Sequence, residues 1–298
     1  MNHPAPPAGH PWHIVGCGRM GTLAAFYLQR AGASVTVIRP GRPHQRRVHL
    51  RFAGDTRSQM LALPVRPPEQ VTAVTRLVVA CKTPYSAARL APIDLAPDAL
   101  VLRLQNGIGS LDGLLRPSQR LIEVVTASAV KSDTPETLDV VAENETAFGG
   151  GTPPADWPTL ARAWPGAQWE HAIRMPQWRK LVVNAVLNPL TALYDVPNGA
   201  LVDNTTLMAP ATALAAEADT ILATLDGGWP GGSIETVRAV AHATAANTSS
   251  MRADLQAGAL TEIEAINGWL VAQAKRLGVA APEHEAIIAR IRARHPAL

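Results

Sequence analysis

Apolar residues form short runs separated by turns in the first half of the chain, and recur with helical spacing in the second. The run His13–Val15 predicts a strand, Met20–Arg30 an amphipathic helix and Ser34–Ile38 a second strand, which together make a βαβ unit. Further strands are predicted at Val48–Phe52, Leu61–Val65, Leu77–Cys81, Leu100–Leu104 and Leu121–Thr126. This order predicts an α/β domain with a doubly wound sheet.

A late hairpin and a change of period mark the end of this domain. Leu138–Ala142 and Thr146–Gly149 predict two paired strands, followed by a short helix near Leu160. Beyond Ile173, apolar residues recur about every 3.6 residues, which predicts helices. These helices are Trp178–Tyr194, Leu207–Leu225, Ile234–Asn247, Thr261–Leu277 and Glu283–Arg292. We therefore expect a sheet domain over residues 1–172 and an all-helical C-terminal domain over residues 173–298.

Composition narrows the class of protein. Of 298 residues, 47% are hydrophobic and 17% charged, and no run approaches the roughly 18 uninterrupted apolar residues of a membrane helix. The proline-rich start, Met1 to Trp12, lacks the basic and apolar segments of a secretion signal. Cys17 and Cys81 are the two cysteines, which allow at most one disulfide. We expect a soluble, cytoplasmic protein.

The distribution of charge predicts a small anionic ligand. The net charge is only +3, and no basic run is interleaved with aromatic residues as in a nucleic-acid surface. Residues 1–54 contain no Asp or Glu, but they contain Arg19, Arg30, Arg39, Arg42, Arg46, Arg47 and Arg51. We expect an anion to bind near this end, and we expect no nucleic acid, membrane or metal as a partner.

A glycine-rich turn lies between the first predicted strand and the first predicted helix. It consists of Gly16, Cys17, Gly18, Arg19, Met20 and Gly21, with the spacing G-x-G-x-x-G. These glycines allow a tight turn and close approach of a pyrophosphate, and the free N–H groups of the helix start bind the phosphates. A tight turn without a ligand has the same spacing, but its flanking elements and the missing acids favour a Rossmann-type dinucleotide site.

The residue after the second predicted strand indicates which dinucleotide binds. NAD-binding domains place Asp or Glu there to accept hydrogen bonds from the ribose 2′-hydroxyl, whereas this chain has Arg39. A guanidinium suits a 2′-phosphate. We therefore expect NADPH or NADP as the cofactor, with a solvated loop charge as the alternative for Arg39.

Lys180 lies in a strongly apolar helix, although this chain uses arginine for most of its positive charge. Asn184 and Asn188 follow at i+4 and i+8 and complete one polar stripe. Such groups are costly to bury without a partner or ligand, and desolvation would lower the pKa of the ammonium toward that of a general acid. Alternatively, Lys180 extends to solvent, Asn184 pairs with a neighbouring loop, and Asn188 caps or breaks the helix before Pro189.

Glu262 is the candidate partner of Lys180. In its predicted helix it lies roughly 60° from the centre of the apolar stripe, whereas Glu264 lies roughly 140° away. Glu262 is therefore expected to face inward and Glu264 water. The alternative is that Glu262 has no site role. Its negative charge would then only interact favourably with the helix dipole in the first turn, while Thr261 and Glu264 form a capping box.

Asparagines in predicted turns are further candidates. Asn106 follows the strand Leu100–Leu104, and doubly wound sheets bind ligands at the carboxyl ends of their strands. The turns that contain Asn198 and Ser250 are also compatible with simple turn or N-cap chemistry. Their residues alone therefore assign no function to Asn198 or Ser250.

Taken in order, these motifs resemble the ketopantoate reductase (2-dehydropantoate 2-reductase) family along nearly the whole chain. The matching segments are Gly16 to Gly21, Arg39-Pro40, Cys81-Lys82, Gln105 to Gly109, Trp178 to Leu181 with Asn184, Asn188 to Ala192, Pro197 to Gly199, Asn247 to Met251 and Thr261 to Ile263. The resemblance implies a Rossmann domain, a helical domain and an active site between them. Arg19 departs from the family pattern, which has a small residue there.

The resemblance also implies a role for each matching side chain. The general acid would be Lys180, with Glu262 as its partner at the substrate. The substrate pocket would be lined by Asn106, Asn184, Asn188, Asn198 and Ser250. Contacts to NADPH would come from the glycine-rich turn, Lys82, Asn106 and Arg39, the last at the 2′-phosphate.

We expect NADPH-dependent reduction of 2-dehydropantoate to pantoate, a reaction of pantothenate biosynthesis, with hydride delivered to C2 and a proton from Lys180. One alternative is a reductase of the same fold for another 2-oxo acid or an imine. Another is a non-catalytic NADP(H) sensor, against which the presence of both Lys180 and Glu262 argues. The sequence is compatible with a monomer or a homodimer.

Overall fold

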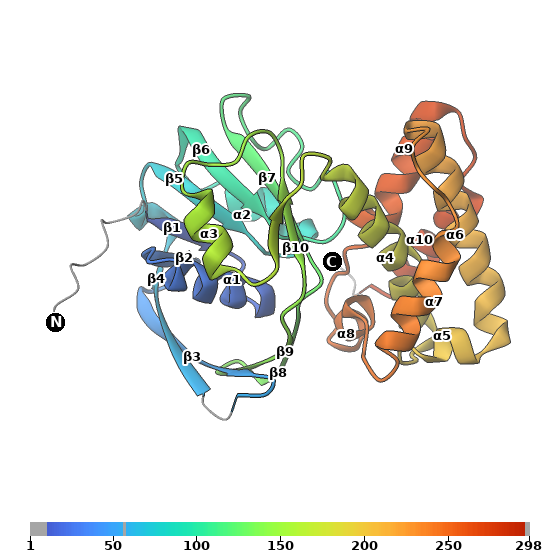
Figure 1. The fold of residues 1–298 in the computed structure, drawn as a ribbon, viewed down its shortest axis with the longest axis horizontal. Helices are drawn as coiled ribbons and strands as arrows, with labels where there is room; N and C mark the ends of the chain where they lie inside the picture. The colour runs from blue at the N-terminus through green and yellow to red at the C-terminus, as the bar shows by residue number, and fades with distance from the viewer. Residues whose placement is uncertain (1–10, 56–57, 296–298) are drawn as a thin grey trace. The chain divides into compact units, whose positions relative to one another are not determined.

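The computed structural model describes residues 11–55 and 58–295, and the chain divides into two compact units (Figure 1). Unit 1 comprises Met1–Gln105 and Leu111–Ile173, and unit 2 comprises Asn106–Ser110 and Arg174–Leu298. The short segment Asn106–Ser110 thus belongs with the second half of the chain, which no sequence pattern indicated.

The described part of unit 1 contains one sheet of eleven strands, in the order β11-β10-β7-β6-β5-β1-β2-β4-β3-β9-β8. The strands are β1 (Trp12–Val15), β2 (Val35–Ile38), β3 (His44–Phe52), β4 (Ser58–Arg66), β5 (Val74–Val79), β6 (Leu95–Arg103), β7 (Arg120–Thr126), β8 (Ala129–Thr134), β9 (Thr137–Ala142), β10 (Thr146–Gly149) and β11 (Ala167–Trp169). The six strands from β4 to β7 are parallel, and they extend to both sides of β1. The predicted doubly wound sheet is confirmed.

Helices cover both faces of this central sheet. Ile14 and Val78 belong to a core shared with α1 (Arg19–Arg30) and α3 (Trp157–Ala163). Their neighbours Val15 and Val79 belong to a second core, shared with α2 (Ser86–Leu90). Because successive side chains of a strand point to opposite faces, a strand covered on both sides is apolar throughout.

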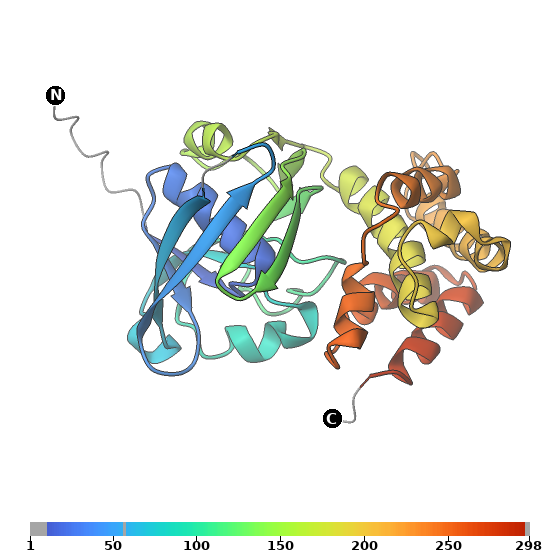
Figure 2. The same cartoon turned by 90° about the horizontal axis from the view of Figure 1, so that it is seen from below.

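The hairpin predicted from Leu138–Ala142 and Thr146–Gly149 is wrong. β9 pairs antiparallel with β8 and parallel with β3, whereas β10 pairs antiparallel with β7. In Figure 2 the blue β3–β4 hairpin and the green β8–β9 hairpin lie side by side. β8 escaped prediction because it contains Lys131 and Ser132, and so lacks the apolar alternation that signals a strand.

The regular secondary structure in the described residues of unit 2 consists of helices, joined by turns and loops. Its helices are α4 (Arg174–Tyr194), α5 (Ala200–Asp203), α6 (Thr205–Leu225), α7 (Ser233–Ala243), α8 (Ser250–Gln256), a π-helix (Glu264–Gly268) that continues into α9 (Trp269–Leu277), and α10 (Pro282–Arg292). The predicted all-helical C-terminal domain is confirmed, although the helix expected from Thr261 begins later and with a π-helical turn. No helix in the described part of the chain is both long and apolar enough to cross a membrane.

The central helix of unit 2 is α4. It packs against α5, α6, α7, α8, α10 and the π-helix, and its residues from Leu181 to Leu193 are buried except for the half-buried Asn184. This environment explains why the helix is apolar nearly all round.

A buried histidine joins α10 to the rest of this bundle. His284 has no exposed surface, and Glu217 of α6 accepts hydrogen bonds from the backbone N–H groups of Glu283 and His284, at 3.0 and 2.9 Å. These bonds satisfy donors that a helix start leaves free. Burial lowers the pKa of His284 to about 4, so its imidazole is neutral near pH 7.

This pKa predicts loss of stability in acid. Below pH 6.5 the unfolded chain binds a proton at His284 that the folded protein excludes until about pH 4, so the stabilising contribution is complete above pH 6.5. As the pH falls from 6.5 to 4, His284 should lower the free energy of unfolding by about 3 kcal/mol. Urea unfolding at pH 7 and pH 4 should show that His284→Gln lacks this part of the decrease, whereas His49→Gln, at an exposed histidine, retains it. Equal pH dependence of all three proteins would contradict the assignment.

Candidate active site

The three motif glycines of unit 1 differ in what surrounds them. Gly16 has φ +88°, and a Cβ there would lie 2.0 Å from the backbone nitrogen of Cys81. A Cβ at Gly21 would lie 2.2 Å from the carbonyl oxygen of Gly16. At Gly18, no described atom lies within 4 Å of an added Cβ. Packing therefore requires glycine at positions 16 and 21, while position 18 faces open space.

The start of α1 lies at this open position and is suited to an anion. Gly18 precedes the helix, no side chain caps it, and its first turn contains no acidic residue. The backbone N–H of Thr22 bonds to the carbonyl of Gly18 at 2.9 Å and makes the first helical hydrogen bond. The backbone N–H groups just before Thr22 therefore have no carbonyl of the preceding helical turn to bond to. Such donors, together with the helix dipole, bind phosphate groups.

A crevice of ≈ 250 Å³ surrounds this turn within unit 1. Several predicted cofactor residues line it, namely Gly16, Cys17, Gly18 and Arg39, and they are joined by His44, Arg46, Cys81, Tyr85 and Arg89. An adjoining, more apolar pocket of ≈ 270 Å³ is lined by Val15, Ile38, Pro40, Pro68, Tyr85, Ala88, Arg89 and Pro92. Lys82 follows Cys81 and is half-buried, but Arg19, Met20, Gly21 and Lys82 lie outside the residues that line these two pockets.

Arg46 is a crevice residue to which the sequence assigned no individual role. Its guanidinium donates hydrogen bonds to the carbonyl oxygen of Cys17 and to the hydroxyl of Thr22. It thereby joins β3 to the glycine-rich turn. Burial raises the pKa of the Cys17 thiol, and the charge of Arg46 opposes that shift. Because β3 begins at His44 rather than at the predicted Val48, Arg46 lies on a part of the strand that was not predicted.

The polar stripe predicted on α4 is present in unit 2. Lys180 and Asn184 are half-buried, and Asn188 is buried. The alternative that Asn188 caps or breaks the helix is wrong, because α4 continues through Pro189 to Tyr194. Three polar side chains therefore lie one turn apart along the central helix.

Asn106 and Glu262 meet within unit 2, 156 positions apart in the sequence. The side-chain amide of Asn106 donates a hydrogen bond of 3.1 Å to the carboxylate of Glu262. Glu262 is buried and Glu264 is exposed, as the periodicity predicted. The carboxylate of Glu264 forms two hydrogen bonds with Arg292, at 2.6 and 2.8 Å, so it pairs with α10 rather than with the helix start.

Backbone contacts hold the segment that contains Asn106 on the π-helix. The N–H of Ile108 bonds to the carbonyl of Ala265 at 2.9 Å. Gly107 has φ +76°, and a Cβ there would lie 2.2 Å from the same carbonyl oxygen. This close approach requires glycine after Asn106, and it places the Asn106 amide beside Glu262.

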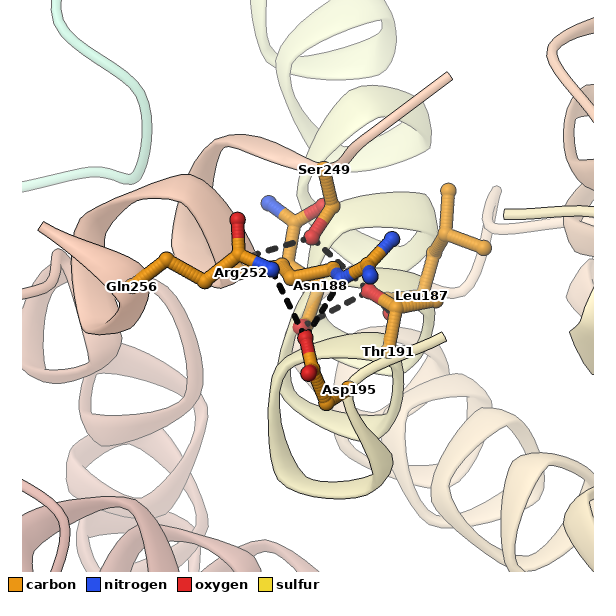
Figure 3. A network of polar contacts seen from close by, with 7 residues as sticks. All are labelled: Leu187, Asn188, Thr191, Asp195, Ser249, Arg252 and Gln256. Carbon is orange, nitrogen blue, oxygen red and sulfur yellow. Dashed lines mark hydrogen bonds and ion pairs between the residues drawn. The ribbon is translucent and has the colours of Figure 1, made fainter. Parts of the chain in front are cut away.

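Helix α8 brings Ser250 to the same α4 stripe, although the sequence predicted no helix there. The amide nitrogen of Asn188 lies 3.5 Å from the hydroxyl of Ser250. Next to it, the hydroxyl of Thr191 donates to Ser249 at 2.8 Å, and Ser249 caps α8 by accepting from the N–H of Arg252 at 3.1 Å (Figure 3). The N-cap alternative for this turn is therefore correct for Ser249.

Asp195, at the end of α4, completes the contact between α4 and α8. Its carboxylate accepts hydrogen bonds from Arg252 and Gln256, each at 2.8 Å (Figure 3). Asn198 lies in the turn that follows; it is buried and donates to the hydroxyl of Thr244 at 3.0 Å. The side-chain oxygen of Asn198 is buried and has no hydrogen-bond partner among the described residues, which is unusual for a buried polar atom.

Both halves of the chain match one known family. Residues 12–152 match Ketopantoate reductase PanE/ApbA, and residues 172–295 match Ketopantoate reductase PanE/ApbA C terminal. A protein of Archaeoglobus fulgidus named 2-dehydropantoate 2-reductase is 30% identical over 273 residues, which cover 89% of this chain and 91% of the relative.

Two solved structures share the fold. A PanE/ApbA family ketopantoate reductase from Ralstonia eutropha JMP134 has a TM-score of 0.80 at 24% identity, with 95% of this chain and 98% of the other covered. D-mandelate dehydrogenase, solved with NADH and anilino(oxo)acetate, has a TM-score of 0.79 at 18% identity, also with 95% and 98% covered. These identities establish the fold alone, whereas the two family matches cover most of the sequence: the chain belongs to the ketopantoate reductase family of oxidoreductases.

Proposed function

We propose that this chain catalyses the NADPH-dependent reduction of 2-dehydropantoate to pantoate, for pantothenate biosynthesis in the cytoplasm. The observation that carries the proposal is the hydrogen bond between Asn106 and Glu262. Asn106 follows β6, one of the parallel strands whose carboxyl ends bind ligands in such sheets. Glu262 is a buried carboxylate, and a buried carboxylate needs polar partners or a ligand.

The crevice of unit 1 suits an NADP molecule. In this proposal, residues 1–172 form the NADP-binding domain and residues 173–298 the substrate domain. The pyrophosphate would lie at the start of α1, next to Gly18, and the guanidinium of Arg39 would bind the 2′-phosphate. Arg46 and Arg89 line the same crevice and add positive charge. Lys82, on the turn after β5, would contact the cofactor as well.

In the proposed reaction the substrate carbonyl gains a hydride at C2 and a proton at oxygen, and it becomes a secondary alcohol. When bound, NADPH supplies the hydride. Lys180 would donate the proton to the carbonyl oxygen, and Glu262 would orient and stabilise the ammonium. The substrate carboxylate and hydroxyl would bind to amides and a hydroxyl, namely Asn106, Asn184, Asn188, Asn198 and Ser250.

A second candidate function is the reduction of another 2-oxo acid. It is favoured by the likeness of fold to D-mandelate dehydrogenase, which was solved with anilino(oxo)acetate. The polar groups expected at the substrate are amides and a hydroxyl, which suit a range of small carboxylates. Oxidation of NADPH, measured with purified protein and a panel of 2-oxo acids, distinguishes the candidates: 2-dehydropantoate should give the highest kcat/KM. Absence of turnover with every substrate would leave only a binding function.

The motif glycines predict a contrast between stability and cofactor binding. Gly18→Ala should leave the melting temperature unchanged and weaken NADPH, because its methyl group projects into the space assigned to the pyrophosphate. Gly16→Ala should destabilise the protein by more than about 1 kcal/mol, because its φ is positive and the Cys81 backbone is too close. Thermal unfolding and fluorescence titration with NADPH measure both effects. Unchanged affinity in Gly18→Ala would place the pyrophosphate elsewhere.

Arg39 should determine the preference for NADPH over NADH. Arg39→Ala should weaken NADPH binding by about 1.5 to 3 kcal/mol, the range for a charge-assisted hydrogen bond, and leave NADH nearly unchanged. Arg42→Ala is the matched control, because Arg42 is exposed nearby but does not line the crevice. Titration with each cofactor tests this; equal losses for NADPH and NADH in Arg39→Ala would contradict it.

The proposed acid and its partner should act as one unit. Lys180→Ala should lower kcat by about two to four orders of magnitude with little change in NADPH affinity, and Lys180→Arg should not restore it, because a guanidinium keeps its proton. Lys275→Ala, at an exposed lysine of α9, should retain full activity.

Glu262→Gln keeps the size of the side chain and removes its charge. We express each loss of kcat as a free energy. The loss in the double variant Lys180→Ala/Glu262→Gln should be smaller than the sum of the losses in the two single variants. Steady-state kinetics of the two single variants and the double variant supply this comparison. Additive losses would mean that Lys180 and Glu262 do not share a site.

A further inference from the structure

Pro189 lies inside α4 and leaves one helical carbonyl without its usual donor. In an α-helix the N–H of residue i bonds to the carbonyl of residue i−4, and proline has no N–H. The carbonyl affected is that of Ala185, a residue with no exposed surface. Bulk water therefore does not reach this carbonyl, and a buried carbonyl needs a donor from elsewhere.

The replacement comes from Asn267, 82 positions further along the sequence. Its side-chain nitrogen donates a hydrogen bond of 2.8 Å to the carbonyl oxygen of Ala185, and Asn267 is completely buried. Helix α6 provides a comparison within the same unit. Pro210 leaves the carbonyl of Thr206 without its helical donor in the same way, but Thr206 is exposed to water. A side-chain donor is thus supplied where the orphan carbonyl is buried.

His284 fixes the orientation of this amide. Its Nδ1 lies 3.0 Å from the side-chain nitrogen of Asn267. With the proton of the neutral imidazole on Nε2, Nδ1 is an acceptor, and the amide nitrogen then faces two acceptors and uses both of its hydrogens. Rotating the amide would place its oxygen against the carbonyl of Ala185. His284 itself is held by the bond from its backbone N–H to Glu217.

Asn267 lies in the π-helix that begins two residues after Glu262. The carbonyl of Glu262 accepts from the N–H groups of Ala265 and Ile266, both at 3.1 Å, and the carbonyl of Ala265 accepts from Ile108. The carboxylate of Glu262 and the amide of Asn267 therefore belong to one hydrogen-bonded turn, and the segment that contains Asn106 is bonded to this turn. Its connection to α4 is made at Ala185, next to Asn184 of the polar stripe.

We propose that Asn267 is a positioning residue for the reduction. Its amide, oriented by His284, replaces the hydrogen bond that Pro189 cannot donate and sets the register of Glu262 and Asn106 against the α4 stripe of Lys180, Asn184 and Asn188. The inference rests on the proposed function, because the groups that it positions are the proposed acid, its partner and the substrate amides.

Replacement of Asn267 by aspartate tests the donor at constant size. In Asn267→Asp a carboxylate faces two acceptors, so kcat should fall by about 100-fold, as for a small misplacement of catalytic groups. The KM for NADPH should stay unchanged, and the pH at which kcat is half-maximal should shift. Asn144→Asp is the matched control, because the Asn144 amide also donates to a backbone carbonyl, that of Ala127 in unit 1; it should retain kcat. Wild-type kcat and an unchanged pH profile in Asn267→Asp would overturn the proposal.

A second pair of variants separates positioning from stability. Pro189→Ala restores an N–H for the carbonyl of Ala185 within α4, so it should recover much of the melting temperature lost in Asn267→Ala. The double variant should nevertheless keep a low kcat, because the turn that follows Glu262 is no longer joined to α4. Recovery of kcat in parallel with the melting temperature would show a purely structural role and overturn the proposal.

The same measurements distinguish failure of this inference from failure of the proposed function. A wild-type protein that does not oxidise NADPH with any 2-oxo acid refutes the proposed function, and with it a role of Asn267 in catalysis. The replacement of the missing bond is tested without turnover, by melting temperatures. If the effects of Pro189→Ala and Asn267→Ala on the melting temperature are additive, the two residues do not serve the same carbonyl. That result would refute the inference about Asn267 and leave the proposed function intact.

Discussion

The burial of α4 on nearly all sides is the constraint on which unit 2 depends. A helix in this position has to pair every polar group that it takes out of water. The hydroxyl of Thr191 meets this requirement through the carbonyl of Leu187 in α4 and through Ser249 of α8. The carbonyl of Ala185 meets it through Asn267. Lys180 and Asn184 are only half-buried. Contacts at buried positions thus hold the helix in place, and the helix is accessible at Lys180 and Asn184, where its proposed chemistry lies.

Unit 1 depends on a different constraint, the approach of one backbone to another. Gly16 and Gly21 are needed because backbone atoms already occupy the space that a side chain would take. Gly18 is not required in this way, since no described atom lies near its missing side chain. The same motif therefore combines two requirements, one from the fold of the protein and one consistent with a ligand. Only the structure separates them, because the spacing G-x-G-x-x-G treats the three glycines alike.

The periodicity of hydrophobic residues was enough to predict which positions of each helix or strand face a core. The central sheet, the helical second half, the polar stripe of α4 and the inward orientation of Glu262 all follow from which positions face a core. The β8–β9 hairpin and α8 escaped prediction because β8 is largely polar and α8 is short. Arg46 and Asn267 escaped it for a further reason. Their partners, Cys17 and Ala185, lie far away in the sequence, and no periodic pattern records such pairs.

Pro189 and Asn267 show how a locally unfavourable residue gains a long-range consequence. Proline in a helix interior costs about 3 kcal/mol, in part through the hydrogen bond that it removes. An alanine at this position would satisfy the carbonyl of Ala185 inside α4, and the bond would then stabilise α4 alone. With Pro189, the same carbonyl is satisfied only when the turn after Glu262 is in place. A local interaction is thereby exchanged for one that also fixes two distant segments of unit 2 relative to each other. The proposed reaction requires this property, because Lys180 lies on α4 and Glu262 lies in the turn before the π-helix.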